Sequence, residues 1–124
     1  MLKRSLFLSP LFALALAGCS PHPATGVWVN DDAAADGFER LIVSYEGQAI
    51  LSVAGDVEKK AERHCFWAGS GAQVIRLICT PAFNAKQEEY YTLAVENGAR
   101  GRLLQNGSTL AWLDRQSDPP LPKR

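Results

Sequence analysis

Turn signals recur along this chain at intervals of roughly 8–12 residues, and they bound short segments of apolar or alternating residues. Asn97-Gly98 and Asn106-Gly107 are the strongest of them, because both residues of a tight hairpin turn must tolerate a positive φ. The other turn signals are Glu46-Gly47, Gly55-Asp56, Gly69-Ser70-Gly71 and a longer loop over Pro81–Lys86. Since this spacing leaves little room for helices, it favours an all-β fold.

The segments between these turns are expected to form about eight short strands. They are Gly26–Asn30, Glu39–Glu46, Ala49–Gly55, Ala61–Trp67, Gln73–Thr80, Glu89–Val95, Arg100–Gln105 and Thr109–Arg115. Strands joined mostly by tight turns predict a small antiparallel up-and-down meander. A meander of this length loses its two exposed edges by closing, so we expect a closed or nearly closed barrel. The stretch from Asp31 to Gly37 is too short for a stable helix and is interpreted as a loop.

Alternation within the strands indicates which side chains share a face. Three sets are expected to do so: Leu41, Val43 and Tyr45; Tyr91, Leu93 and Val95; and Leu110 with Trp112 in the last strand. Neighbouring aromatic residues, in contrast, cannot all point inward; these are Phe66, Trp67, Tyr90 and Tyr91, beside Phe83 in a loop. Part of this aromatic set must therefore be exposed, and an exposed aromatic patch favours a protein partner.

The N-terminus carries a secretory pattern. Lys3 and Arg4 precede a mostly apolar stretch, Leu6–Ala17, which is shorter than the ~20 residues of a spanning helix. The stretch ends in Leu16-Ala17-Gly18-Cys19, which resembles the lipobox of bacterial lipoproteins. An ordinary signal peptide that ends near a cysteine, or an uncleaved anchor helix, is the alternative.

The lipoprotein resemblance implies cleavage before Cys19 and attachment of several acyl chains to that cysteine, which anchor a protein stably. It implies a location in the bacterial cell envelope, and Ser20 resembles the sorting signal of outer-membrane lipoproteins that face the periplasm. The expected organisation is a signal peptide over 1–18, a lipidated extended tether over 19–25 and a barrel domain over 26–115, followed by a Pro-rich flexible tail over 116–124.

Cys65 and Cys79 remain as a pair once Cys19 is assigned to lipid. In an oxidising compartment they are expected to form a disulfide, which would stabilise the domain by roughly 3 kcal/mol. Their spacing is offset from an ideal hairpin register, so a bulge or a diagonal pairing is needed across the Gly69–Gly71 turn. Catalytic or metal-binding thiols are the alternative, but the chain has no C-x-x-C motif and only His64 lies nearby.

Gly26-Val27-Trp28 in the first expected strand and Arg115 at the end of the last resemble the lipocalin signature. In that family a tryptophan closes the barrel base and an arginine from the final strand stacks on it as a cation–π contact. The resemblance covers about residues 25–115 and implies barrel-closure roles for Gly26, Trp28 and Arg115. The chain is shorter than lipocalins and lacks their long helix, and strands this short can leave a filled interior without a ligand pocket.

The residues that carry chemistry elsewhere form no recognisable catalytic site. His22 lies in the tether and His64 in a strand, and neighbours such as Glu88 and Glu89 point to opposite faces of a strand. Asp31-Asp32 and Asp36 lack the spacing of a calcium loop. Without Lys3 and Arg4 the mature chain of about 106 residues has 11 basic and 13 acidic residues, a net charge of −2, which disfavours nucleic-acid binding. We expect neither an enzyme nor a cofactor.

Two functions remain open. The first is a lipid-anchored β-domain that binds an envelope protein partner, as an inhibitor, an immunity protein or an assembly accessory. The second is a lipocalin-like carrier of a small apolar ligand. The tail motif Pro119–Arg124 matches ligands of SH3 domains, although a flexible end is the simpler interpretation.

Overall fold

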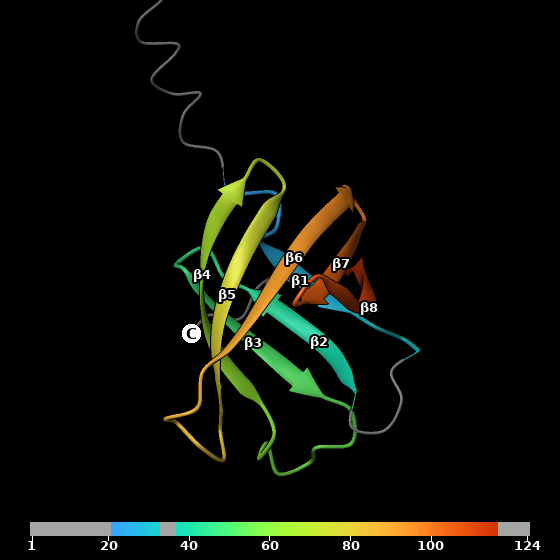
Figure 1. Ribbon diagram of the computed structural model, residues 1–124. Helices are drawn as coiled ribbons and strands as arrows, with labels where there is room; N and C mark the ends of the chain where they lie inside the picture. Colours follow the sequence, from blue (N-terminus) through green and yellow to red (C-terminus); the bar gives the residue numbers. More distant parts are fainter. Residues whose placement is uncertain (1–20, 33–36, 117–124) are drawn as a thin grey trace, which may run out of the picture.

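The computed structural model describes residues 21–32 and 37–116, which form a closed barrel of eight antiparallel strands (Figure 1). Each strand pairs with the next in sequence, and β1 pairs with β8 to close the barrel. The strands are β1 (Gly26–Val29), β2 (Phe38–Val43), β3 (Gln48–Val53), β4 (Arg63–Gly71), β5 (Val74–Pro81), β6 (Glu89–Asn97), β7 (Arg100–Gln105) and β8 (Ser108–Arg115). The all-β meander and its closure are confirmed. Within the described residues, no helix is long and apolar enough to cross a membrane.

The two strongest turn signals both mark hairpins. Asn106 and Gly107 have φ values of 54° and 81°, as the β7–β8 hairpin requires. The β6–β7 turn lies one residue later than expected. Asn97 pairs with Arg100 as the last rung of the ladder, and the Ala99 N–H donates to Asn97 Oδ1 at 2.9 Å. The expected turn over Asn97-Gly98 is thus corrected to Gly98-Ala99, because a bulge before Asn97 shifts the register.

The inward-facing side chains of all eight strands form one hydrophobic cluster. Tyr91, Leu93 and Val95 belong to it, which confirms that they share the inner face of β6. Its largest fully buried members are Trp28, Leu41, Leu51, Ile75, Leu77, Leu93, Leu103 and Leu113. At roughly 1.5–3 kcal/mol for each large side chain, this burial is the main stabilising contribution to the fold.

One expectation about faces is wrong. Tyr45 does not continue the inner face of Leu41 and Val43; it is 66% exposed, because β2 ends at Val43 and Tyr45 lies in the turn. In β8, Leu110 and Trp112 share a face as expected, and because they are 44% and 43% exposed, that face is the outer one. The inner positions belong to the small Ala111 and to Leu113, which pair with inner residues of β7. Alternation alone does not say which of two apolar faces is buried.

The described part of the expected tether is folded onto the barrel, which corrects the prediction of an extended segment. The Thr25 N–H donates to the His22 carbonyl at 3.1 Å and so closes a turn. Ala24 is completely buried, and its carbonyl accepts a hydrogen bond from Trp28 Nε1 at 3.0 Å. A buried apolar contact and a buried hydrogen bond outweigh the extended preference of the prolines.

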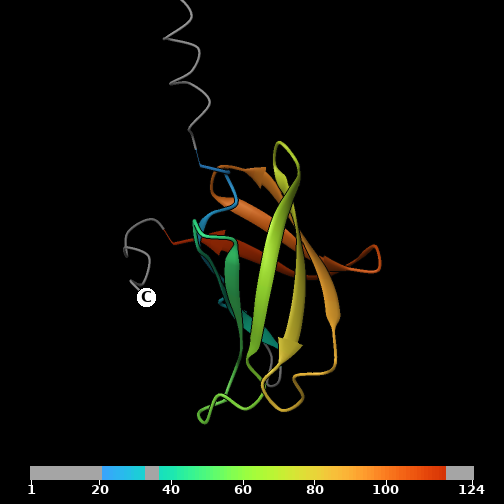
Figure 2. The ribbon, with the colours of Figure 1, turned by 90° about the vertical axis from the view of Figure 1, so that its left-hand side faces the viewer.

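The barrel has two distinct ends. Residues 21–25 lie at the same end as the β4–β5 and β6–β7 hairpins, which we call the upper end (Figures 1 and 2). The longer β3–β4 and β5–β6 loops lie at the opposite, lower end. The outer surface of β4–β6 runs between the two ends.

Candidate functional site

Trp28 and Arg115 meet where the first and last strands close the barrel. They are directly paired across the β1–β8 seam, and the Arg115 guanidinium lies 4.4 Å from the centroid of the Trp28 ring. Arg115 also donates to the carbonyls of Gly98, Thr25 and Pro23. Burial lowers the pKa of Arg115 without removing its charge, since arginine remains protonated in proteins. The cation–π contact implied by the lipocalin resemblance is present in this geometry.

Glycines make this contact possible. Gly26 has a φ of 136°, and a Cβ at this position would lie 2.5 Å from Arg115 Nη1. Both the backbone conformation and the space therefore require glycine. A Cβ on Gly101 would lie 3.1 Å from the Trp28 ring, so this strand position also keeps the indole close to the backbone. The closure role of Gly26 fits these contacts, whereas Gly101 escaped the sequence interpretation because it lies far from Trp28 in the chain.

The predicted disulfide is present. Cys65 and Cys79 are directly paired residues of β4 and β5, and their sulfur atoms are bonded inside the barrel. A bulge between Gly69 and Gly71 supplies the register shift that the cysteine spacing requires. Of the two alternatives, a diagonal pairing is thus not needed.

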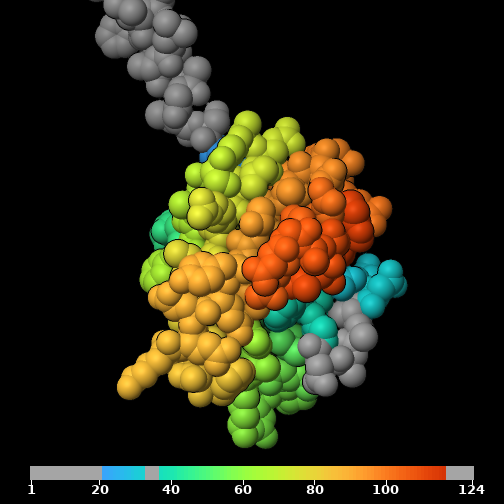
Figure 3. Space-filling model, in the orientation of Figure 1, coloured from blue at the N-terminus to red at the C-terminus, as the bar shows by residue number. Residues whose placement is uncertain are grey.

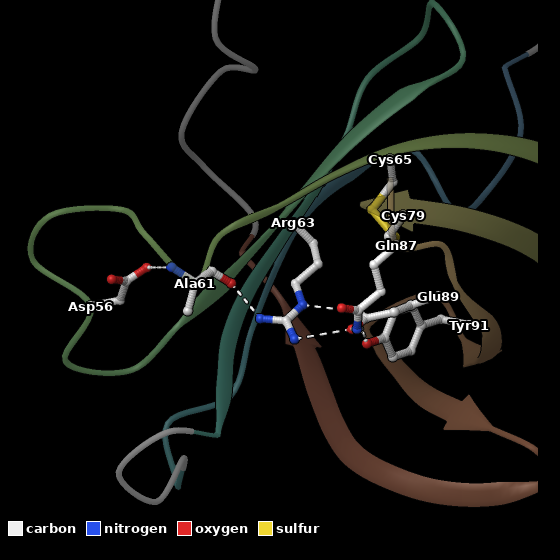
Figure 4. A network of polar contacts seen from close by, with 8 residues as sticks. All are labelled: Asp56, Ala61, Arg63, Cys65, Cys79, Gln87, Glu89 and Tyr91. Atoms are coloured by element: carbon white, nitrogen blue, oxygen red, sulfur yellow. Dashed lines mark hydrogen bonds and ion pairs between the residues drawn. A yellow bond between two sulfur atoms is a disulfide. The ribbon is translucent and has the colours of Figure 1, made fainter. Parts of the chain in front are cut away.

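Below the disulfide, a polar network fills the lower end of the barrel (Figure 4). Arg63 Nε donates to Glu89 Oε1 at 2.9 Å, and the Tyr91 hydroxyl donates to the same oxygen at 2.7 Å. The Arg63 guanidinium also lies 5.5 Å from the ring centroid of Phe38 and 5.8 Å from that of Phe83. These side chains occupy the lower opening of the barrel. A lipocalin-like carrier would need an open cavity above this point.

The hydrogen bond from Arg63 lowers the pKa of Glu89 and raises that of Arg63. Desolvation, followed by the hydrogen bond to Glu89, raises the pKa of Tyr91 to about 12. The pair is thus charged and the phenol protonated at neutral pH. Such a network is suited to holding three strands together, because every charged group in it is already partnered.

The neighbouring carboxylates have separate roles. Glu89 points inward to Arg63, whereas Glu88 accepts a hydrogen bond from the outward-facing Tyr90 hydroxyl at 2.7 Å. His64 lies on the outer face, with Nε2 3.2 Å from Glu62 Oε1, and His22 lies at the upper end. Among the described residues, no three histidine, cysteine, aspartate or glutamate side chains are arranged to hold a metal ion. Asp36, the lipobox and the Pro-rich tail lie outside the described residues.

A depression on the outside of the barrel is separate from the core. A depression of about 270 Å³ is lined by Val29, Asn30, Asp31, Glu39 and Arg40 at the lower ends of β1 and β2. None of these residues belongs to the buried cluster, so the depression does not open into the core. Its volume is also below the ~300 Å³ at which ordinary ligand pockets begin.

The most distinctive exposed feature is a row of apolar side chains across three strands. Phe66 of β4 pairs with Ile78 of β5, which pairs with Tyr90 of β6. The three residues are 68%, 45% and 58% exposed. We call them the apolar row; it lies on the outer face of β4–β6, strands at the left and centre of Figure 1, and Figure 3 draws the same view of the molecule with all atoms. The expectation of an exposed aromatic set is confirmed, since Trp67 and Tyr91 point inward and Phe66, Tyr90 and Phe83 do not.

Arginines and a tryptophan extend this surface toward β8. The guanidinium groups of Arg100 and Arg102 lie 4.7 Å and 5.5 Å from the ring centroid of the half-exposed Trp112. Arg76 is exposed and precedes Ile78 by two residues in β5, so the two side chains are neighbours on the outer face of this strand. We call the apolar row together with Arg76, Arg102 and Trp112 the docking surface. Tyrosine, tryptophan and arginine are the residues most enriched in the energetic centres of protein interfaces.

No family model, no curated protein and no solved structure matches this chain.

Proposed function

We propose that the protein is a non-enzymatic, lipid-anchored domain that binds a protein partner in the bacterial envelope through the docking surface. The anchor is the lipidated Cys19, and the barrel presents the surface on its side. An inhibitory, immunity or assembly role would each use the chain in this way. The observation that carries the proposal is the apolar row, three exposed hydrophobic side chains aligned across neighbouring strands of a closed barrel.

The apolar row lies outside the core of a closed barrel, so it has no packing role within the fold. In an open sheet, an apolar row can be covered by another layer, but this barrel already has its core inside. The row is therefore additional to what the fold needs. Large apolar side chains clustered on a surface are a feature of interaction sites.

The charges around the row indicate the chemistry of the partner. Arg76 lies one outward-facing position from Ile78 in β5, whereas Arg102 lies farther along the same face, opposite Ala94, and is paired with Glu96 at 3.3 Å. Acidic groups lie on the same face, since Glu88 accepts a hydrogen bond from Tyr90 and Glu96 pairs with Arg102. The complementary partner is a protein surface with an apolar centre and a carboxylate positioned to meet Arg76.

The carrier alternative is not the function that we propose. Its support was the strand count with Trp28 and Arg115, and both features also serve a barrel with a packed interior. Interior side chains from every strand pack together, and the Arg63–Glu89 pair occupies the lower mouth. Detection of a co-purified lipid by native mass spectrometry would support the carrier function instead.

A pull-down of the protein from crosslinked envelope of cells that naturally produce it tests the proposal. The lipidated protein is compared with the double variant Phe66→Thr/Tyr90→Thr, because threonine keeps the strand preference while removing the aromatic area. Phe83→Thr is the matched control, since Phe83 is 62% exposed but lies in a lower loop. We expect the double variant to lose a discrete partner that the control retains. Equal recovery with both variants would contradict the proposal.

A further inference from the structure

The segment that leads from the lipidation site into the barrel is fixed at its beginning by His22. His22 Nε2 lies 2.9 Å from the Gly71 carbonyl, and Nδ1 accepts a hydrogen bond from the Ala24 N–H at 3.1 Å. Since the Ala24 N–H can only donate, the ring is the tautomer that carries its proton on Nε2 and donates to Gly71. The imidazole also lies edge-on to Trp67, with 5.8 Å between the ring centroids.

The same segment is fixed at its other end by Arg115. Arg115 Nη1 donates to the Thr25 carbonyl at 2.6 Å, and Nη2 donates to the Pro23 carbonyl. Gly69 leaves room for the imidazole, because a Cβ there would lie 3.2 Å from the ring. Residues 22–25 are thus held against the upper end from two sides, and they do not act as a free spacer.

The short connection to the anchor limits how the barrel can stand. Cys19 precedes His22 by three residues, which span at most about 10 Å when fully extended. We propose that the upper end of the barrel rests against the phospholipid headgroups of the membrane, so that the barrel has a fixed orientation. This inference rests on the proposed lipid anchor at Cys19.

The surface of the upper end fits this placement. The tip of its β4–β5 hairpin is Gly69-Ser70-Gly71, which is small and uncharged and can approach headgroups closely. Tyr45, 66% exposed in the β2–β3 turn, lies at the same end, because the Trp67 indole donates to the neighbouring Ser44 carbonyl at 3.0 Å. Tyrosine is enriched at the level of lipid headgroups.

The proposed orientation also places the docking surface. Phe66 lies five residues from Gly71 along β4, about 12 Å in height for a strand tilted as in small barrels. In this orientation the apolar row would lie on the side of the barrel, a short distance above the membrane, and its side chains would point parallel to the membrane plane. A partner that is itself bound to the membrane could reach it.

Depth-dependent fluorescence quenching tests the orientation. A fluorophore is attached to Ser70→Cys at the upper end or to Lys86→Cys in the lower β5–β6 loop, with Cys65 and Cys79 oxidised. The lipidated proteins are inserted into phosphatidylethanolamine and phosphatidylglycerol vesicles that carry a headgroup quencher. The two positions differ in height by about 20 Å or more, so we expect quenching at 70 to exceed quenching at 86 at least about threefold.

An inserted linker provides the control. Eight glycine and serine residues placed between Ser20 and Pro21 lengthen the connection without altering the described barrel. The quenching ratio of positions 70 and 86 should then fall toward one, while flotation with the vesicles stays unchanged. Equal quenching in the vesicle-bound parent protein would overturn the orientation and leave the anchor intact. Failure of the parent protein to float would overturn the anchor and the orientation with it.

Discussion

The guanidinium of Arg115 covers the ring of Trp28 at 4.4 Å, and these two residues are also paired across the seam of the barrel. The seam is short, because β1 and β8 share only the register pairs Trp28–Arg115 and Val29–Asp114. Arg115 compensates for this by bonding three carbonyls from two other segments. One side chain therefore links the closure of the barrel to the position of the N-terminal segment.

Replacing Arg115 by alanine should lower the free energy of unfolding by about 2–4 kcal/mol, since a cation–π contact and several hydrogen bonds are lost. Urea unfolding of the unlipidated domain measures this. Arg76→Ala, which removes an exposed arginine from β5, is the control and should change stability by less than about 0.5 kcal/mol. A small effect of Arg115→Ala, similar to that of the control, would show that the seam does not depend on it.

Reduction of the Cys65–Cys79 disulfide should lower stability by roughly 3 kcal/mol, because the unfolded chain gains freedom between the two cysteines. Thermal unfolding with and without reductant measures the change. The double variant Cys65→Ala/Cys79→Ala should start from the lower midpoint and show no response to reductant. A wild-type midpoint that reductant does not move would contradict the structural role of the bond.

Acidification should weaken the lower end of the barrel through Glu89. The hydrogen bond from Arg63 lowers the pKa of Glu89 in the folded chain below its ordinary value of 4.5. The resulting stabilisation is complete above that value and is lost as the pH falls through the folded-state pKa. Unfolding measured between neutral and acidic pH should show this loss in the wild type. Glu89→Gln should be less stable at neutral pH and lose part of the pH dependence, whereas Glu88→Gln should retain it.

Cys19→Ser should abolish lipidation and release the protein from the membrane fraction, because the remaining apolar segment is too short to span a bilayer. Mass spectrometry of the intact protein and fractionation of the envelope measure the two effects. Ser20→Ala is a neighbouring control that leaves Cys19 in place. Membrane retention of the unlipidated Cys19→Ser protein would identify the N-terminal segment itself as the anchor.

The sequence was sufficient for the strand order because turn chemistry is local. Asn106-Gly107 specifies its hairpin through backbone φ values, and the neighbouring strands follow from alternation. Which face is inside depends on the register with other strands, so the sequence alone does not show that the face shared by Leu110 and Trp112 is the outer one. A single strand with apolar residues on both faces carries no information on that choice.

The candidate sites divide in the same way. Trp28 and Arg115 could be named because they resemble a known pair at the ends of a barrel. The alignment of Phe66, Ile78 and Tyr90 could not, because it depends on cross-strand register and on a bulge in β4. The Arg63–Glu89 pair was missed since its members lie 26 residues apart and neither belongs to a motif.

The most direct test of the docking surface is photocrosslinking in living cells. Benzoylphenylalanine replaces Phe66 or Tyr90 in the apolar row, or Phe83 in the lower loop as an equally exposed aromatic control. We expect one discrete adduct with another envelope protein from positions 66 and 90, absent from position 83. We also expect Ile78→Thr to weaken this adduct. Adducts of equal yield from all three positions, or adducts only with a second copy of the chain, would contradict the proposed docking surface.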